Sequence, residues 1–269
     1  MGRGHALSIE PITADDVSPP EMARLAAQNG VAYFGVVVQQ RPGRPDWGLI
    51  GDTPMRRQTL EACRQCGVQV DLIESFLLEP SQDIAAFAPA LESGAWLGAR
   101  ALTLLVRDPD RPRLIDRIHL MCELAEPLGL QVLMEFTPRM SIKTFADAAE
   151  LAAQVARPSL GIVVDSLHMA RTGAWTQTIP LLRSPLVRRL QLSDGPLVIA
   201  QEDGLHEAMS ERQLPGEGQF ALGELIAAVP DGIRIGIEVP QERAVRAGLS
   251  AAQRVKRAVD ATRRLVIQA

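Results

Sequence analysis

The stretch Leu160-Gly-Ile-Val-Val-Asp165 is an apolar run that ends in a carboxylate. A short continuous apolar run fits a buried strand of a parallel sheet, because helices cover both faces of such a strand. The acid then marks the point where the strand leaves the core. The runs Gln131-Val-Leu-Met-Glu135 and Ile233-Arg-Ile-Gly-Ile-Glu238 end in the same way. We therefore expect a parallel sheet whose strand ends carry polar groups at one edge.

Similar runs recur along the chain and alternate with helical patterns. The expected strands are Ala6–Glu10, Ala32–Val38, Val68–Glu74, Ala101–Val106, Gln131–Phe136, Leu160–Asp165, Val187–Leu192 and Ile233–Glu238. Between them stand residues that start and stop helices, such as Asp52-Thr53-Pro54 and Gly67. This alternation predicts a parallel sheet with crossover helices.

Eight β-α units in 269 residues favour an α/β fold of one domain, a (β/α)8 TIM barrel that spans residues 1–269. The structural alternative is an open doubly wound sheet. Such a sheet normally has a glycine-rich phosphate turn after its first strand, and the segment Glu10-Pro-Ile-Thr-Ala has none. We therefore expect the closed barrel.

The composition excludes several classes of function. A net charge of -4 does not indicate binding to nucleic acid or to an anionic membrane. No apolar run approaches the roughly 20 residues that span a bilayer, and Met1-Gly-Arg-Gly-His5 does not resemble a signal peptide. Three cysteines make no disulfide framework. We expect a cytoplasmic protein whose partner is a small molecule, and the sequence leaves a homo-oligomer open.

Four polar residues stand at or near the ends of four successive expected strands: Glu135, Asp165, Gln191 and Glu238. Neighbouring strands of a closed barrel converge at one rim, so these side chains can meet around one ion. Three carboxylates and an amide oxygen are hard ligands, which suit Mn²⁺, Mg²⁺ or Co²⁺ better than Zn²⁺. The alternative is that each acid only caps the helix that follows it. We predict that all four residues bind one divalent metal ion.

Two further side chains are candidates for contact with a substrate. His168 follows the acid of its strand by three residues, where it can act as an acid or base or simply cap the next helix. Arg212 lies in a turn-rich segment, and its guanidinium can bind substrate hydroxyls or a carboxylate unless it is only a surface residue. Weaker candidates on the same rim are Lys143, Arg139 and His206.

The motifs Asp165-Ser-Leu-His168 and Arg212-Gln-Leu-Pro215-Gly-Glu-Gly218, with Glu135 and Glu238, resemble those of the xylose isomerase-like TIM barrels. That group includes sugar isomerases, 3-epimerases and endonuclease IV. The resemblance covers roughly residues 100–240 well and the N-terminal third only by architecture.

The resemblance implies a divalent ion that chelates adjacent oxygens of a hydroxy-carbonyl substrate. It also implies that Glu135 and Glu238 lie on opposite faces of the substrate, as metal ligands that also move a proton. A metal-stabilised enediolate would then lead to isomerisation or epimerisation. His168 and Arg212 would position the substrate oxygens.

Gln191 departs from the sugar epimerases of this group, which usually have His at this position. Glutamine there is similar to the 3-dehydroshikimate dehydratases of the same superfamily, which expel a hydroxyl instead. We expect a metal-dependent isomerase or epimerase of a sugar or related compound, with a dehydratase as the first alternative. A barrel that only binds a small ligand or assists a partner subunit is the second, although it would not need two opposed glutamates. The endonuclease branch needs many histidines for its zinc site, and only His168 and His206 are expected near the rim.

Overall fold

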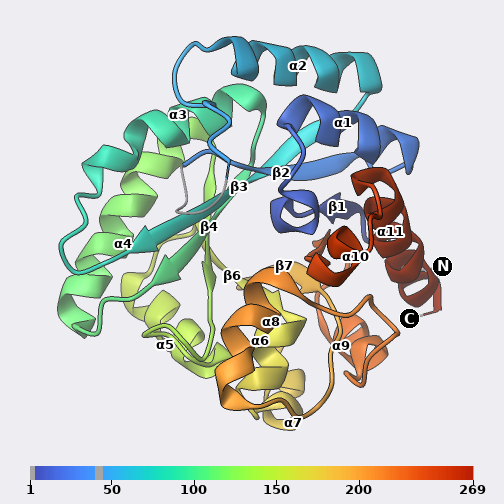
Figure 1. The fold of residues 1–269 in the computed structure, drawn as a ribbon. Helices are drawn as coiled ribbons and strands as arrows, with labels where there is room; N and C mark the ends of the chain where they lie inside the picture. Colours follow the sequence, from blue (N-terminus) through green and yellow to red (C-terminus); the bar gives the residue numbers. More distant parts are fainter. Residues whose placement is uncertain (1–3, 40–44, 269) are drawn as a thin grey trace.

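The computed structural model describes residues 4–39 and 45–268, which form a closed barrel of eight parallel strands surrounded by helices (Figure 1). The strands are β1 (Leu7–Ile9), β2 (Tyr33–Val37), β3 (Gln69–Leu78), β4 (Ala101–Val106), β5 (Gln131–Glu135), β6 (Leu160–Asp165), β7 (Val187–Leu192) and β8 (Arg234–Ile237). They are hydrogen-bonded in sequence order, and the pairing of β1 with β8 closes the barrel. The predicted single-domain (β/α)8 TIM barrel is confirmed.

Helices and short 3₁₀ turns connect the strands around the outside of the barrel (Figure 1). The helices are α1 (Pro19–Gln28), α2 (Pro54–Cys66), α3 (Ala88–Leu97), α4 (Arg111–Ala125), α5 (Phe145–Val155), α6 (Ser166–Arg171), α7 (Trp175–Thr178), α8 (Gly204–Ser210), α9 (Leu222–Ala228), α10 (Glu242–Arg246) and α11 (Ala251–Gln268). The 3₁₀ turns are η1 (Pro11–Ala14), η2 (Ala85–Phe87), η3 (Glu126–Leu128), η4 (Ile179–Leu181) and η5 (Gln201–Asp203). No helix among the described residues is long and apolar enough to cross a membrane.

Local sequence signals set the ends of α2 as expected. The Thr53 side chain accepts a hydrogen bond from the backbone N–H of Arg56, and Pro54 occupies the first turn. Gly67 ends the helix at φ 67°, a left-handed conformation that glycine adopts without strain. The predicted start and stop of this helix are therefore confirmed.

Strand β3 is longer than expected, and its register shifts twice, once against β2 and once against β4 between Ile73 and Phe76. Relative to β2, the register shifts so that Val70 and Leu72 face consecutive partners, which leaves Asp71 as the extra residue. Side chains of a regular strand alternate between its two faces, so residues three apart would point in opposite directions. The bulge allows Asp71 and Glu74 both to point into the barrel, where each contacts a side chain of β7.

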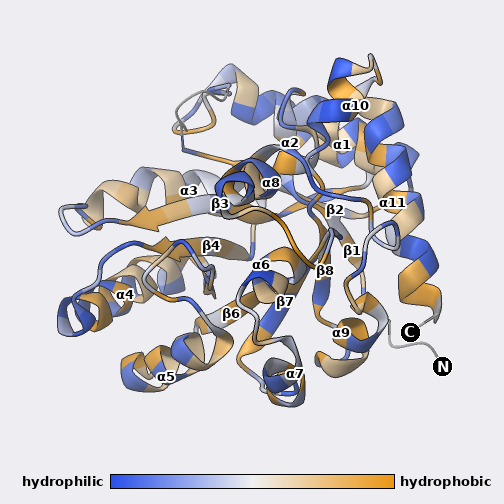
Figure 2. Ribbon diagram, turned by 60° about the horizontal axis from the view of Figure 1, so that its bottom comes forward, coloured by the Kyte–Doolittle hydropathy of each residue, from blue (hydrophilic) through white to orange (hydrophobic). Residues whose placement is uncertain are grey.

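The apolar core has two parts. The larger part lies between the strands and the helices that surround them, and a small cluster of Leu72, Ala101, Leu133 and Val163 fills the inside of the barrel. Figure 2 shows β3 and β4 largely in the hydrophobic colour, whereas α4 and α11 alternate hydrophilic and hydrophobic residues. This pattern is that of buried parallel strands under amphipathic helices.

Charged residues share the inside of the barrel with that small apolar cluster. Arg189 donates to Glu10 Oε1 at 2.6 and 2.9 Å and to Asp71 Oδ2 at 3.2 Å, and Arg234 Nε donates to the same Asp71 oxygen at 2.9 Å. Burial raises the pKa of Glu10 to about 8, although the charge of Arg189 opposes that shift. We call Glu10, Asp71, Arg189 and Arg234 the interior ion cluster.

Candidate functional site

The four predicted strand-end residues lie at the carboxyl ends of adjacent strands. Gln191 follows Arg189 by two residues on β7, so its side chain points into the same interior one layer higher. In the sheet register Asp165 is the partner of Gln191, and Gln191 is the partner of Gly236, two residues before Glu238. We call Glu135, Asp165, Gln191 and Glu238, together with His168 and Arg212, the rim cluster.

Arg212 is buried and connects two of the carboxylates. Its Nη1 lies 2.8 Å from Asp165 Oδ2 and 2.8 Å from Glu238 Oε2, and its Nε donates to the carbonyl of Ala208 at 3.1 Å. With only 5% of its surface exposed, Arg212 is not the surface residue that the sequence left open. The residues predicted from separate motifs are thus in direct contact, while their roles stay predictions.

The two carboxylates bound to Arg212 have opposite pKa shifts. Burial alone would raise the pKa of Asp165, but the charges of Arg212 and His168 hold it below its usual value. The pKa of Glu238 is raised well above its usual value, chiefly by burial and also by the nearby charge of Asp165. Opposite shifts in neighbouring acids are typical of sites that hold and move protons.

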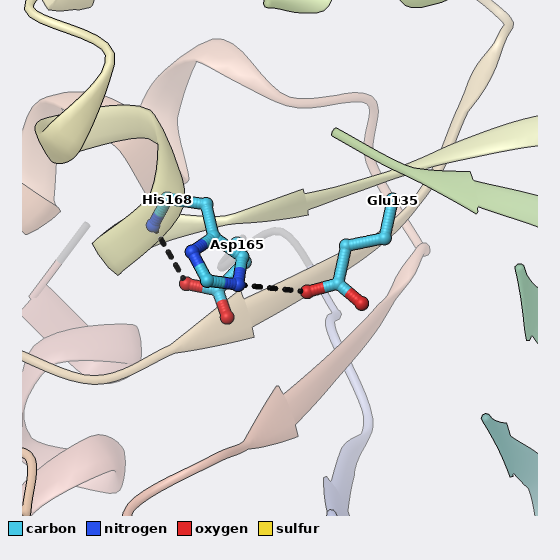
Figure 3. A group of neighbouring side chains, drawn as sticks. All are labelled: Glu135, Asp165 and His168. Carbon is cyan, nitrogen blue, oxygen red and sulfur yellow. Dashed lines mark hydrogen bonds and ion pairs between the residues drawn. The ribbon is translucent and has the colours of Figure 1, made fainter. Parts of the chain in front are cut away.

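His168 brings Glu135 and Asp165 together (Figure 3). Asp165 Oδ1 accepts hydrogen bonds from the backbone N–H groups of Leu167 at 2.6 Å and His168 at 3.2 Å, so this acid does cap α6. The His168 Nε2 lies 3.3 Å from Glu135 Oε1. One ligand atom each of Glu135, Asp165 and His168 lie within 4.8 Å of one another, a spacing that one metal ion can bridge.

The amide of Gln191 provides a test of whether the site suits a cation. Its Nε2 donates to Glu74 Oε1 at 3.1 Å and to Glu238 Oε1 at 3.5 Å. Its Oε1 is buried and has no hydrogen-bond partner among the residues that the structure describes. A buried acceptor without a partner is costly, and a divalent cation would satisfy it. The donor set of carboxylates and an amide oxygen therefore fits a hard divalent ion.

Glu74 was missed as a site residue in the sequence, although it carried the same signal as the others. The expected strand Val68–Glu74 is also an apolar run that ends in a carboxylate. In the structure Glu74 is buried, lies against Gln191 and accepts from Thr103 Oγ1 at 3.5 Å. Strand β3 thus contributes a further carboxylate beside the rim cluster.

The segment that carries Arg212 is held by Asp194. This carboxylate accepts hydrogen bonds from the backbone N–H groups of Gly195, Gly216 and Phe220 at 2.8 to 3.0 Å. Gly216 has a φ of 88°, and a Cβ at Gly218 would lie only 2.2 Å from Asp194 Oδ1. Both glycines of the motif are therefore needed for the backbone to close around this acid.

A cavity of about 480 Å³ opens over the rim cluster. Glu135, His168, Arg212 and Glu238 line it, whereas Asp165 and Gln191 are fully buried behind them. Glu74 also lines the cavity, and the apolar part of its wall includes Ile12, Leu77, Leu105, Leu205 and Met209. The volume and the mixed lining suit a small polar molecule.

The three weaker candidates separate in the structure. Arg139 lines the cavity, is exposed, and forms no ion pair with any residue in the described ranges. Lys143 lines a neighbouring cleft instead. His206 Nε2 lies 3.4 Å from Glu242 Oε2, and the side chain is 55% exposed. Of these three residues, only Arg139 therefore lies where it can contact a molecule bound in the cavity over the rim cluster.

Comparison with known sequences gives one family. The profile of the family described as "xylose isomerase-like TIM barrel" matches residues 23–265. An inosose isomerase of Halalkalibacterium halodurans is 25% identical over 148 residues, which cover 53% of this chain and 50% of that protein. An inosose isomerase of Bacillus subtilis is 29% identical over 72 residues, or 26% of each chain. The matched part of the chain thus spans about half the length of the first relative and about a quarter of the second.

Comparison with solved structures supports the same fold. The IolI protein with a bound zinc atom has a TM-score of 0.81 at 17% identity, and the match covers 98% of both chains. A probable 3-DHS dehydratase, AsbF of Bacillus anthracis, has a TM-score of 0.73 at 18% identity over 96% of this chain and 98% of that one. At these identities the likeness concerns the fold alone.

Proposed function

The chain belongs to the xylose isomerase-like TIM barrel family, and from that premise we propose that it is a divalent-metal-dependent isomerase or epimerase of a sugar or related hydroxy-carbonyl compound. The observation that carries the proposal is that Glu135 and Glu238, at the ends of two different strands, both line the one cavity above the rim cluster. Two inosose isomerases among the sequence relatives support the same reaction class.

In this proposal the metal ligands are Glu135, Asp165, Gln191 and Glu238, of which Gln191 Oε1 lacks another partner among the described residues. A bound divalent ion supplies a positive charge that polarises the carbonyl group and acidifies the neighbouring C–H. Asp165 and Gln191 have no surface on the cavity, so their part in the reaction is to hold the ion rather than to contact the substrate.

The groups that face the cavity carry out the proton transfer. Glu135 takes the proton from the carbon beside the carbonyl, and Glu238 returns a proton to the other carbon or the other face. His168, 3.3 Å from Glu135, keeps that carboxylate in place and donates to a substrate oxygen. Arg212 fixes Glu238 through the 2.8 Å contact and faces the substrate with the rest of its guanidinium.

A second candidate is a dehydratase that acts on a hydroxy-carbonyl acid, similar to 3-dehydroshikimate dehydratases. Two observations favour it: glutamine rather than histidine at position 191, and the guanidinium of Arg139 at the cavity without an ion pair among the described residues. A carboxylate on the substrate would find a partner in Arg139. A neutral sugar has no group that needs this charge.

The test is a screen of ketoses, inosose-type cyclitols and 3-dehydroshikimate with added Mn²⁺ in deuterated water. Deuterium in an isomeric product supports the isomerase or epimerase, and loss of water supports the dehydratase. Failure to bind Mn²⁺, or conversion without any exchange of the carbon-bound proton, contradicts the proposed chemistry.

The Arg139→Ala variant separates the two candidates. With an acidic substrate we expect KM to rise about tenfold or more, since one charge-assisted contact is lost. With a neutral sugar we expect KM to stay within about twofold. Arg107→Ala is the control, because the Arg107 guanidinium also lines the cavity but is already paired with Glu79 at 2.7 Å.

A further inference from the structure

We propose that Glu74 is a positioning residue, whose carboxylate turns the Gln191 amide so that the amide oxygen faces the metal ion. The inference rests on the proposed function, in which Gln191 is a ligand. It adds to the site a residue of β3, a strand that contributes no predicted ligand. It also gives a physical reason for glutamine at position 191.

The first step concerns what surrounds the amide. Gln191 is completely buried, and its nitrogen faces two carboxylates, Glu74 Oε1 at 3.1 Å and Glu238 Oε1 at 3.5 Å. A carboxylate oxygen accepts hydrogen bonds, so an oxygen at this position attracts the amide NH₂ rather than the amide oxygen. The shorter contact is with Glu74. The orientation of the amide is therefore set chiefly from β3.

The second step concerns the other end of the same amide. Once the NH₂ faces Glu74, the oxygen must point the opposite way, and it is there that Oε1 is buried without a hydrogen-bond partner among the described residues. Leaving a buried acceptor unsatisfied is costly. The contact with Glu74 thus holds the amide oxygen in position for a cation. It also prevents the amide from rotating to form a hydrogen bond through that oxygen.

The third step explains the choice of side chain. A primary amide has two N–H donors and an acceptor, so it can donate to two carboxylates and still present an oxygen to a cation. A neutral imidazole has one N–H donor and one nitrogen that can bind a metal. It could donate to Glu74 or to Glu238 but not to both. A strand with Glu74 beside position 191 therefore suits glutamine better than histidine.

Glu74 is itself held in place. It is 4% exposed, it accepts from Thr103 Oγ1 of β4, and the bulge at Asp71 fixes the direction in which it points. A ligand that is oriented by a fixed hydrogen bond loses less freedom when the metal binds. Removal of such supporting partners typically costs about 10–100-fold in metal affinity.

The experiment measures the Kd for Mn²⁺ by titration calorimetry of the full chain. We expect Glu74→Gln to weaken binding about 10–100-fold. We expect a similar loss in Glu74→Asp, which keeps the charge but shortens the side chain so that it no longer reaches Gln191. Thermal unfolding of each metal-free variant is measured in parallel, and an unchanged Tm shows that the loss of affinity is not a loss of folding.

A double substitution separates orientation from simple charge. If Glu74 acts through Gln191, then Glu74→Gln adds nothing to the affinity lost in Gln191→Ala, so the two effects are not additive. Additive losses, or wild-type affinity in Glu74→Asp, would overturn the inference and leave the proposed function intact. A wild-type protein that binds no Mn²⁺ would overturn the proposed function and this inference with it.

Discussion

The interior ion cluster and the rim cluster lie one above the other inside the same barrel, yet their charges are arranged differently. In the interior ion cluster two arginines face two acids, and Arg189 contacts both Glu10 and Asp71. In the rim cluster Arg212 pairs with Asp165 and Glu238, Glu135 lies against His168, and Glu74 lies beside them as a fourth acid. His168 adds a positive charge only when it is protonated.

This difference separates a structural network from a binding site. The interior ion cluster balances two acids with two arginines, and breaking such a buried set destabilises the fold, although Glu10 Oε2 also lacks a hydrogen-bond partner among the described residues. A buried set with excess negative charge and an unsatisfied acceptor gains a partner when a cation binds. We therefore expect substitutions in the interior ion cluster to affect folding stability, and substitutions in the rim cluster to affect ligand binding and turnover.

Substitution of the two glutamates at the cavity tests the rim cluster and has the largest expected effect. We expect Glu135→Gln and Glu238→Gln each to lower kcat/KM about 10²–10⁴-fold, since each removes a group that moves a proton. Steady-state kinetics on the substrate found by the screen measures this. Glu207→Gln is the control, because Glu207 is a buried acid paired with Arg171 that does not line the cavity. Comparable losses in all three variants would contradict the assignment.

Substitution of Arg189 tests the interior ion cluster. Arg189→Met leaves Glu10 and Asp71 without their shared partner, and we expect the free energy of unfolding to fall by about 3–5 kcal/mol. Urea unfolding measures it, and Lys256→Met, which breaks an exposed pair with Asp260, should change it by less than about 1 kcal/mol. If Arg189→Met were as mild as Lys256→Met, the interior cluster would not be the structural network.

The loop that carries Arg212 links the stability of the fold to the geometry of the rim cluster. In Gly218→Ala the new Cβ would lie 2.2 Å from Asp194 Oδ1, so the loop must shift at a cost of about 1–3 kcal/mol in stability. Turnover should fall too, since Arg212 moves with the loop. Gly223→Ala is the matched control, because Gly223 lies in α9 with open space around it. Equal melting temperatures for the two variants would argue against this role of Asp194.

The pH dependence of stability gives the most specific effect, because it traces to one carboxyl group. Burial raises the pKa of Glu10 from 4.5 to about 8, so the folded state binds this proton more tightly than the unfolded state. The resulting stabilisation is complete below about pH 4.5 and is lost as the pH rises through about 8. The slope is at most about 1.4 kcal/mol per pH unit. Urea unfolding at several pH values should show a flatter profile for Glu10→Gln, and an unchanged profile would exclude this group as its source.

The sequence was sufficient for the barrel because its strands are buried on both faces and read as apolar runs. The polar residue at the end of such a run also indicates the rim, which is why Glu135, Asp165 and Glu238 could be placed in advance. Helix ends such as Thr53 and Gly67 are local signals that involve only a few neighbouring residues. These features depend on short stretches of chain.

The contacts between distant segments could not be read in the same way. The position of Arg212 between Asp165 and Glu238 depends on how the loop after β7 closes over the rim. The interior ion cluster joins residues up to 179 positions apart, and nothing local in Glu10 or Arg189 indicates the partner. Glu74 carries the strand-end signal, but its hydrogen bond to Gln191 on β7 is a contact of this long-range kind.

The extra residue in β3 has a consequence for comparing this protein with its relatives. Counted from Val70 along a regular strand, Glu74 would fall on the outer face, toward the helices. In an alignment with a barrel whose third strand is regular, a one-residue gap at Asp71 would place Glu74 opposite an inward residue. The presence or absence of that insertion is therefore a sequence marker to look for beside glutamine at the position of Gln191.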